Sequence, residues 1–553
     1  MSEFYTLHKD TLEKAIKAKK DRGYWSAYPE TPSRKIYGEN AAKDGLAAFQ
    51  AQLNNEFLMD HPNDLGLIGD EKSPYGFDLK ISYPAASVDE LVKLSKIAGK
   101  AWAKISISER AGILLEILKR TNARSFEMAQ AVMHTTGQAF AMAFQAGGPH
   151  AQDRALEAVA YAYDTMAEIP ARASWVKPQG KHDPLNMEKK FRLIPRGVSS
   201  VIGCSTFPTW NTYPGMFASL MTGNSVIIKP LSGAILPAAI SVKISREVLV
   251  EADIDPNVIL LGVDSADAPM TKALVQHADV KIIDYTGNTE FGTWIENNAP
   301  QAQVYTEKAG LNSIVIESVD NMRAVAGNIA FSLSLYSGQM CTTPQNIFIP
   351  KDGIETADGH LSFDDVTKAI AISVEKLLGD PARANGILGA IQNPATYDRA
   401  ILANGEANVI LKSLEPKNEE FEGARMVGPV LIKVDASQSD IYETEKFGPI
   451  SYMIACDNAE HALELAASGA SQHGAITAAV YSQNEAFIEQ TEDAFADAGV
   501  ALSCNLVGNI FVNQSAAFSD YHVSGANPAG NACLSDTAYV ANRFRVAASR
   551  KLV

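Results

Sequence analysis

Short apolar runs alternate with helical stretches from about residue 196 onward. Five of these runs have the length and composition of buried strands. They are Val198–Ile202, Ser225–Ile228, Asn257–Leu261, Val280–Ile283 and Gln303–Thr306. Roughly 20 to 30 residues separate successive runs, the spacing of β-α-β units. The pattern predicts an open α/β nucleotide-binding layer with a parallel sheet, and the alternation continues to about residue 517.

The chain before this layer has a different pattern. Helical periodicity dominates residues 87–166. Residues 1–78 form an N-terminal extension that carries no recognisable chemistry, with one lysine-rich helix expected near its start. A polar segment rich in lysine and proline, about residues 170–191, separates the helical block from the strands.

Composition narrows the function class. The chain has 553 residues, of which 46% are hydrophobic and 20% charged, with a net charge of −16. An acidic surface repels phosphate backbones and anionic membranes, so nucleic acid and membranes are not expected as partners. The five cysteines form no C-x-x-C pair, no apolar run reaches 18 residues, and the first 20 residues hold no apolar signal segment. A cytoplasmic protein with thiols kept reduced is expected.

Cys341 is the strongest candidate for chemistry. It follows a helical pattern and lies in Ser337-Gly338-Gln339-Met340-Cys341. A small Gly338 allows a tight turn, on which a thiol can act as a nucleophile. A buried, inert cysteine is the alternative that the local sequence leaves open.

Two more residues lie at the ends of predicted strands or in their loops. Glu307 follows the run Gln303–Thr306, at the edge of the sheet where a carboxylate can serve as a general base. Asn211 lies in an aromatic, proline-rich loop that can hold its amide as an oxyanion donor. A solvated glutamate and a helix-capping asparagine are the alternatives.

Nucleotide-binding features are present without the usual glycine fingerprint, because the chain contains no G-x-G. Lys229 follows a predicted strand and can reach a ribose hydroxyl or a phosphate. The turn Thr286-Gly287-Asn288-Thr289-Glu290-Phe291-Gly292 opens a helix and suits a pyrophosphate. A later turn holds Glu445-Lys446-Phe447-Gly448-Pro449.

Together, six motifs in this order resemble the aldehyde dehydrogenase superfamily from about residue 80 to about 520. Glu307 precedes Cys341 by 34 residues, the separation typical of that family. The resemblance implies a Rossmann-like cofactor domain and an α/β catalytic domain with a small oligomerisation arm. It implies an extension at 1–78, a cofactor-binding domain at 79–306, a catalytic domain at 307–523 and a C-terminal tail with an oligomerisation role at 524–553. The arm is expected at about 170–195, and a homodimer or homotetramer follows from it.

The resemblance also implies a reaction. Cys341 attacks an aldehyde, Asn211 and the Cys341 N–H hold the oxyanion, a hydride leaves to a nicotinamide, and Glu307 activates water to release a carboxylic acid. No metal is implied. The family's cofactor contacts correspond to Trp210, Lys229, Ser232, Gly287, Asn288, Gly292, Glu445 and Phe447.

Departures from the family pattern refine these expectations. Ser232 stands where enzymes that use NAD carry a glutamate, so acceptance of NADP is predicted, with NAD as the alternative. The family's Pro-Phe-Gly-Gly loop is replaced by residues 524–531, which predicts a different wall of the substrate pocket.

The extension, the run from Cys341 to Asn346 and the segment 515–531 are most similar to the phenylacetate-degradation (PaaN) branch. That branch implies a small-molecule substrate, a coenzyme A-linked semialdehyde from aromatic ring cleavage. A general small-aldehyde dehydrogenase and a non-catalytic scaffold that retains the fold are the alternatives.

Overall fold

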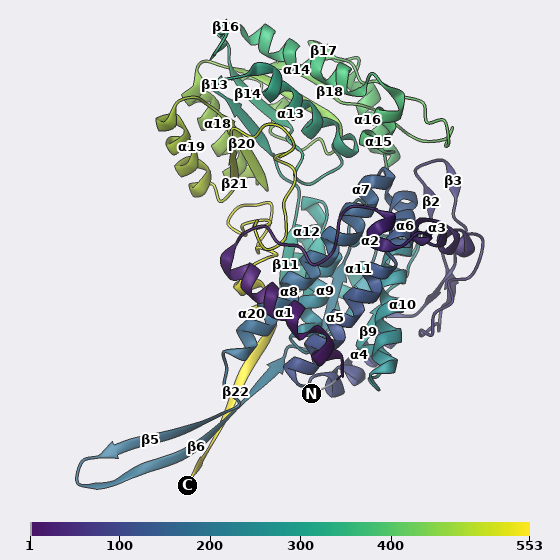
Figure 1. Ribbon diagram of the computed structural model, residues 1–553, viewed down its shortest axis with the longest axis vertical. Coiled ribbons are helices and arrows are strands. Elements are labelled where there is room, and N and C mark those ends of the chain that lie inside the picture. The colour runs from purple at the N-terminus through teal and green to yellow at the C-terminus, as the bar shows by residue number, and fades with distance from the viewer. Residues whose placement is uncertain (1–2) are drawn as a thin grey trace.

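A computed structural model describes residues 3–553, and Figure 1 shows how they are arranged. Two bodies lie one above the other, and a thin arm leaves the lower body. The lower body carries the N-terminal segments and a five-stranded sheet, and the upper body carries a seven-stranded sheet. This mixed α/β architecture is the fold class that the sequence predicted.

The five-stranded sheet contains the five predicted strands, with small shifts at their ends. Its strands are β7 (Val198–Ile202), β8 (Ser225–Lys229), β9 (Ile259–Leu261), β10 (Val280–Thr286) and β11 (Gln303–Glu307). All pair in parallel in the order β11-β10-β7-β8-β9. The chain order therefore reverses beside β7, and such a switch point opens a ligand crevice at the carboxyl edge of a sheet.

Helices cover both faces of this sheet because the strands are apolar on both sides. One face packs against α4 (Val88–Trp102), α11 (Thr271–Gln276) and α12 (Thr289–Asn298). The other face packs against α9 (Thr212–Met221) and α10 (Leu236–Glu251), which α5 (Ile107–Ala123), α6 (Ser125–Thr136) and α8 (Ala151–Ala167) cover in turn. Helix α7 (Phe140–Gln145) and a π-helical turn (Ala146–His150) precede α8.

The N-terminal extension wraps around this helical layer. Helix α1 (Glu3–Asp21) is the lysine-rich helix predicted near the start of the chain, and it packs on α5 and α8 through the buried residues Leu12 and Ala15. The elements that follow are α2 (Arg34–Tyr37), α3 (Ala41–Gln52), β1 (Gly66–Ile68), β2 (Lys72–Ser73), β3 (Phe77–Asp78) and β4 (Tyr83–Ala85). Across residues 3–553, no helix is long and apolar enough to cross a membrane.

The upper body is built on a seven-stranded sheet in the order β17-β18-β19-β14-β12-β20-β21. Only the edge pair β17-β18 is antiparallel among its strand pairs as described for residues 3–553. The strands are β12 (Ser313–Ile316), β14 (Asn346–Pro350), β17 (Val409–Leu411), β18 (Val430–Asp435), β19 (Ile450–Cys456), β20 (Thr477–Tyr481) and β21 (Ala501–Cys504). A small sheet holds β13 (Ser318–Val319), β15 (Ile354–Thr356) and β16 (Gly359–Leu361).

Two helical groups bury the faces of the upper sheet. One face packs against α13 (Met322–Ser334), α14 (Phe363–Leu378) and α15 (Pro381–Leu388), and the other packs against α18 (Ala459–His473) and α19 (Glu485–Asp497). Two shorter helices, α16 (Pro394–Ala403) and α17 (Ser439–Tyr442), complete the layer.

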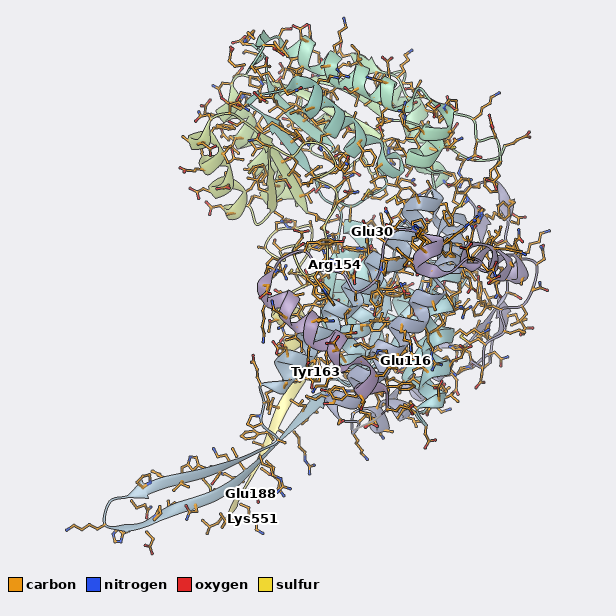
Figure 2. The ribbon with its side chains drawn as sticks, viewed as in Figure 1. Glu30, Glu116, Arg154, Tyr163, Glu188 and Lys551 are labelled. Carbon is orange, nitrogen blue, oxygen red and sulfur yellow. The ribbon has the colours of Figure 1, made fainter. Side chains whose placement is uncertain are left out.

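The arm is a three-stranded sheet in which β6 (His182–Pro195) pairs with β5 (Arg172–Gln179) and with the C-terminal strand β22 (Phe544–Leu552). Glu188 and Lys551 face each other in this register, and both project from the arm in Figure 2. Just before β22, helix α20 (Thr537–Ala541) packs on α8 and α9. The C-terminal tail is therefore tied to the lower body as well as to the arm.

Candidate active site

The turn that carries Cys341 is strained. After α13 the backbone passes through Tyr336, Ser337 and Gly338 with φ of 54°, 50° and 66°. A Cβ at Gly338 would lie 2.6 Å from the carbonyl oxygen of Gly448, so only glycine fits there. This tight turn explains the glycine that the sequence placed before Cys341, and it leaves the Cys341 side chain half-buried.

Glu307 and Asn211 come from two different strand ends and meet at Cys341. Glu307 is the last residue of β11 and is 1% exposed, and Asn211 follows β7 at the start of α9. Asn211 Nδ2 donates to Glu307 Oε2 across 3.0 Å. Cys341 Sγ lies within 4.8 Å of a carboxylate oxygen of Glu307. The Asn211 side chain makes no capping bond to its helix, so the alternative reading of a capping asparagine is not what the structure shows.

His522 is a fourth member of this group that the sequence did not indicate. Its Nε2 lies 3.3 Å from Glu307 Oε1, and since a carboxylate only accepts, the ring N–H donates. Its ring also contacts Trp210 edge to face, with 4.5 Å between ring centres. His522 and Asn211 therefore hold the two oxygens of Glu307 from opposite sides.

Burial and charge keep the nucleophile protonated in this state. Burial, and then the Glu307 carboxylate, raise the pKa of the Cys341 thiol well above its usual range. A second thiol lies nearby: Cys204 Sγ donates to Asn211 Oδ1 across 3.4 Å, and burial raises the pKa of Cys204 to about 11. Cys204 thus fixes which end of the Asn211 amide faces Glu307.

The peptide of Cys341 is held by Asn312. Asn312 Nδ2 donates to the carbonyl oxygens of Cys341 and Thr343, at 2.7 and 3.1 Å. Its Oδ1 accepts from the backbone N–H groups of Ile476 and Thr477 at the start of β20. A rigid peptide here gives the Cys341 N–H a fixed direction, which an oxyanion donor requires.

A cavity of about 610 Å³ opens in front of Cys341, Asn211 and His522. Its wall is largely aromatic and aliphatic, with Trp25, Met142, Phe207, Trp210, Phe331, Met340, Ile387, Ile510 and Phe511 among the lining residues. The charged or titratable lining residues are Glu30, His150, Asp153, Asp520 and His522. No lysine or arginine lines the cavity within residues 3–553. The cavity therefore suits a substrate whose part in contact with the wall is uncharged.

Residues of the N-terminal extension form part of this wall, namely Tyr24, Trp25, Ser26 and Glu30. The segment is tied down by Asp153, which accepts from Ser26 Oγ at 2.5 Å and from the Ala27 N–H at 3.0 Å. Glu30 lies near the junction of the two bodies in Figure 2. The extension therefore contributes to the cavity wall, which its sequence pattern did not indicate.

Residues 524–531, the segment for which a different pocket wall was predicted, are not among the residues that line the cavity. They lie behind Glu307, where the Lys308 N–H donates to the Ala529 carbonyl and Gly530 forms a β-bridge to Glu307. The lining comes from the preceding residues, from Asn509 to His522. The loop thus braces the carboxylate from the side opposite the cavity.

The predicted cofactor residues lie along the carboxyl edge of the five-stranded sheet. Lys229 ends β8, is buried, and pairs with Asp264 across 2.8 Å. Ser232 is half-buried in the turn that follows β8. Lys229 is therefore a buried, ion-paired residue of the sheet edge and not a surface lysine.

Two helix N-termini face this edge, and one is already satisfied. At the start of α10, the N–H groups of Ile235 and Leu236 both donate to Glu71 Oε1, a buried carboxylate from the N-terminal extension. At α12, Asn288 Oδ1 accepts only from the Phe291 N–H among its described contacts. In the same turn the Gly287 N–H donates to the Glu307 carbonyl and the Gly292 N–H donates to the Asn288 carbonyl. An anion at this turn would therefore use other N–H groups of the first turn of α12.

Glu445 and Phe447 lie on the loop that touches Gly338. Glu445 accepts a long hydrogen bond, 3.4 Å, from the Gly310 N–H, and burial raises its pKa to about 7. A half-buried carboxylate with spare acceptor capacity suits the hydroxyls of a ribose. With Lys229 and the α12 turn, these residues fit a dinucleotide. Trp210, which the resemblance assigned to the cofactor, is among the residues that line the cavity.

Comparison with known proteins gives one family. The model described as "Aldehyde dehydrogenase family" matches residues 82–531. Among solved structures, an NAD-dependent aldehyde dehydrogenase from Burkholderia multivorans is 53% identical, with a TM-score of 0.98 over 100% of this chain and 99% of that one. A 1-pyrroline-5-carboxylate dehydrogenase from Thermus with bound NAD, 18% identical and with a TM-score of 0.73 over 96% of this chain and 99% of its own, shares the fold.

Curated relatives are more distant. A 1-pyrroline-5-carboxylate dehydrogenase of Geobacillus sp. (strain WCH70) is 24% identical over 462 residues, 81% of each chain. An N-succinylglutamate 5-semialdehyde dehydrogenase of Paraburkholderia xenovorans (strain LB400) is 25% identical over 393 residues, 70% of this chain and 75% of its own.

Proposed function

The chain belongs to the aldehyde dehydrogenase family, and from this premise we propose that it oxidises an aldehyde to a carboxylic acid with NAD(P), using Cys341 as nucleophile. One observation carries the assignment of residues: Cys341, Glu307 and Asn211 converge at the end of one cavity from three separate parts of the chain. A scaffold that only retained the fold would not need this convergence.

The first step follows from the contacts of Glu307. A carboxylate oxygen of Glu307 lies within 4.8 Å of Cys341 Sγ, so Glu307 is placed to take the thiol proton, directly or through one water, as Sγ attacks the aldehyde carbon. The S–C bond forms, and the electrons of the C=O double bond move to oxygen. Asn211 Nδ2 and the N–H of Cys341 stabilise that oxyanion.

The bound dinucleotide supplies the hydride acceptor. Lys229, the α12 turn and Glu445 would hold it at the sheet edge. Once the hydride has left, the group on Cys341 is a thioester. Glu307 releases the thiol proton to solvent, and its carboxylate can then take a proton from the water that attacks the thioester carbon. The C–S bond breaks and the thiolate leaves, so one aldehyde and one water give one acid and a free thiol.

The substrate proposed is a semialdehyde linked to coenzyme A, as in the ring-cleavage branch that the sequence resembles. The cavity supports this choice because its wall is largely apolar and holds no lysine or arginine within residues 3–553. An acyl chain and the neutral pantetheine arm fit such a wall, and the phosphates would lie outside the mouth. A small free aldehyde is the competing substrate.

Acceptance of NADP is proposed as well. Ser232 places no carboxylate beside the site of the 2′-hydroxyl, so a 2′-phosphate meets no repulsion there. The 53% identical relative is described as NAD-dependent, which supports use of NAD in addition. Parallel assays with NAD and NADP test this, and Ser232→Glu should reduce the kcat/KM with NADP much more than with NAD.

Assembly into a homodimer, or a dimer of dimers, is proposed for the arm. Its apolar side chains are open to solvent in one chain: Val176 is 57% exposed, Ile194 45% and Val546 45%. Exposed apolar residues on a long, thin sheet are typical of a surface that packs against a partner, and the partner proposed is a second copy of this chain. Light scattering at micromolar concentration should give at least a dimer, and a pure monomer would contradict the proposal.

The experiment that tests the function is NAD(P)H formation by purified protein. The panel contains a coenzyme A-linked semialdehyde and small free aldehydes, each with NAD and with NADP. Turnover that is lost in Cys341→Ala is expected. Turnover on free aldehydes alone would keep the chemistry and reject the linked substrate, and dinucleotide binding without any turnover would favour the scaffold.

A further inference from the structure

The side chains around Cys341 have the composition of a metal site. Cys341 Sγ, a carboxylate oxygen of Glu307 and His522 Nε2 all lie within 4.8 Å of one another. They come from the turn after α13, the end of β11 and the segment after β21. A thiolate, a carboxylate and an imidazole are the three ligand types that Zn²⁺ takes in proteins.

The distances fit a tetrahedral ion with little movement. Zinc bonds of about 2.0–2.3 Å place tetrahedral ligand atoms about 3.3–3.6 Å apart. The His522 Nε2 and Glu307 Oε1 atoms are already 3.3 Å apart. The thiol needs to approach by at most about 1.2–1.5 Å, the difference between 4.8 Å and such an edge. A rotation of the Cys341 side chain supplies a movement of this size.

Neighbouring side chains hold two of the three proposed ligands in place. The contact with Trp210 orients the His522 ring, and the bond from Asn211 orients Glu307. Hydrogen-bond and packing partners of this kind fix ligands before a metal arrives. The fourth position opens toward the cavity of about 610 Å³ that Cys341 and His522 line. Three protein ligands with one open position are typical of an accessible zinc site.

We propose that Cys341, Glu307 and His522 bind Zn²⁺ and that this ion inhibits the enzyme reversibly. Binding forms a Zn–S bond in place of the S–H bond, and the thiol proton leaves to solvent. His522 Nε2 also exchanges its proton for the metal, and the neutral ring carries its proton on Nδ1 instead; no oxidation or reduction takes place. The bound ion coordinates the Cys341 thiolate and the Glu307 carboxylate at the same time. Cys341 can then no longer act as the nucleophile, and Glu307 can no longer act as the general base. The inhibition rests on the proposed function, whereas the binding of the metal does not.

Two features of this inhibition follow from the geometry. The ion occupies the place of the aldehyde at the end of the cavity, so zinc competes with the aldehyde. The dinucleotide residues Lys229 and Glu445 are not ligands, so zinc should not compete with NAD(P). A chelator such as EDTA should restore full activity, because no covalent change has occurred.

A second group at the cavity wall offers a comparison. His150 Nε2 lies 2.6 Å from Glu30 Oε2, and Asp153 lines the same cavity. This group has no thiol. A metal held there would give no sulfur ligation and would depend on His150 instead of His522.

The test is a titration of the full-length protein with Co²⁺, which takes the same ligands as Zn²⁺ and shows a thiolate-to-cobalt charge-transfer absorption. The expected result is one Co²⁺ per chain with this absorption, displaced by Zn²⁺. It should be absent in Cys341→Ala and unchanged in Cys504→Ser and His150→Gln. In His522→Gln the affinity for Co²⁺ should fall by more than about tenfold. Mutation of a residue that only orients a metal ligand typically costs at least about tenfold in affinity, and loss of the ligand itself should cost no less.

Each other outcome is decisive. No charge-transfer absorption in the wild-type protein, or an unchanged affinity in His522→Gln that circular dichroism shows to be folded, overturns the site. Inhibition by Zn²⁺ that His150→Gln relieves also overturns it. Cobalt binding as expected in a protein that oxidises no aldehyde would contradict the proposed function and leave the metal site standing.

Discussion

Asn211 donates to Glu307 across 3.0 Å, although 96 residues separate them in the chain. The two side chains come from the carboxyl ends of β7 and β11, which lie in one parallel sheet with β10 between them. The bond holds the oxyanion donor and the general base at one fixed separation beside Cys341. Since the amide has a second N–H, it can serve the oxyanion while it still holds the carboxylate.

The first prediction concerns the reactivity of Cys341. Glu307 is a cause of the raised thiol pKa, so removal of its charge in Glu307→Gln should lower that pKa. The rate of Cys341 alkylation by iodoacetamide should then rise at lower pH in the variant than in the wild-type protein. Mass spectrometry of the Cys341 peptide follows the reaction. A profile that stays in place or moves to higher pH would show that Glu307 does not face the thiol.

The second prediction concerns pH and the dinucleotide. The pKa of Glu445 is raised to about 7 by burial, so the carboxylate gains its charge as pH rises through that value. A charged acceptor binds ribose hydroxyls more strongly, so the Kd for NAD(P) should fall by about tenfold between pH 6 and pH 8.

Glu445→Gln should bind NAD(P) weakly at both pH values, which fluorescence titration measures. Equal pH dependence in this variant and the wild-type protein would assign the effect to another group.

The third prediction concerns the N-terminal wall of the cavity. Asp153→Ala removes the two hydrogen bonds to Ser26 and Ala27 that hold the segment. At about 1 kcal/mol each, their loss should raise local opening by about tenfold or more. Hydrogen exchange over residues 24–30 should accelerate, and KM for the aldehyde should rise more than kcat falls.

Asp358→Ala, at an exposed turn of the upper body, is the matched control. If both variants leave KM and exchange unchanged, the segment is not part of the substrate wall.

The fourth prediction concerns the C-terminal tail. Arg543 is fully buried and binds both carboxylate oxygens of Asp284 in β10, as well as Ser219 Oγ. Arg543→Met leaves Asp284 buried without its partner, which should lower the free energy of unfolding by about 3–5 kcal/mol. Arg550→Met, exposed on the arm, should change it by less than about 0.5 kcal/mol. Urea denaturation measures both, and equal effects would contradict the anchoring role.

Local pattern predicted the sheet edge well. The apolar runs from Val198 to Thr306 became β7 to β11, because parallel strands buried on both faces need continuous apolar residues. Residues just after such strands meet at one edge, so Asn211 and Glu307 could be expected to approach each other. The tight turn at Gly338 could be expected from its neighbours as well.

Contacts between distant segments could not be predicted in this way. His522 reaches Glu307 from a loop without regular structure, and Trp25 reaches the cavity from the N-terminal extension. Neither residue has a periodic pattern or a motif, and each position depends on the packing of whole bodies. The contact of Glu71, which accepts hydrogen bonds from the N–H groups at the start of α10, could not be predicted for the same reason.

The central claim is that Cys341 forms a thioester that Glu307 hydrolyses. Rapid mixing of enzyme, NAD(P) and an aldehyde substrate, with NAD(P)H absorbance followed over the first turnover, tests it most directly. The account predicts steady turnover in the wild-type protein and none in Cys341→Ala. In Glu307→Gln it predicts at most one NAD(P)H per active site, and then a steady rate at least about 100-fold lower, the size of a lost general base. A Glu307→Gln variant that turns over at the wild-type steady rate, or a Cys341→Ala variant that still forms NAD(P)H, would contradict it.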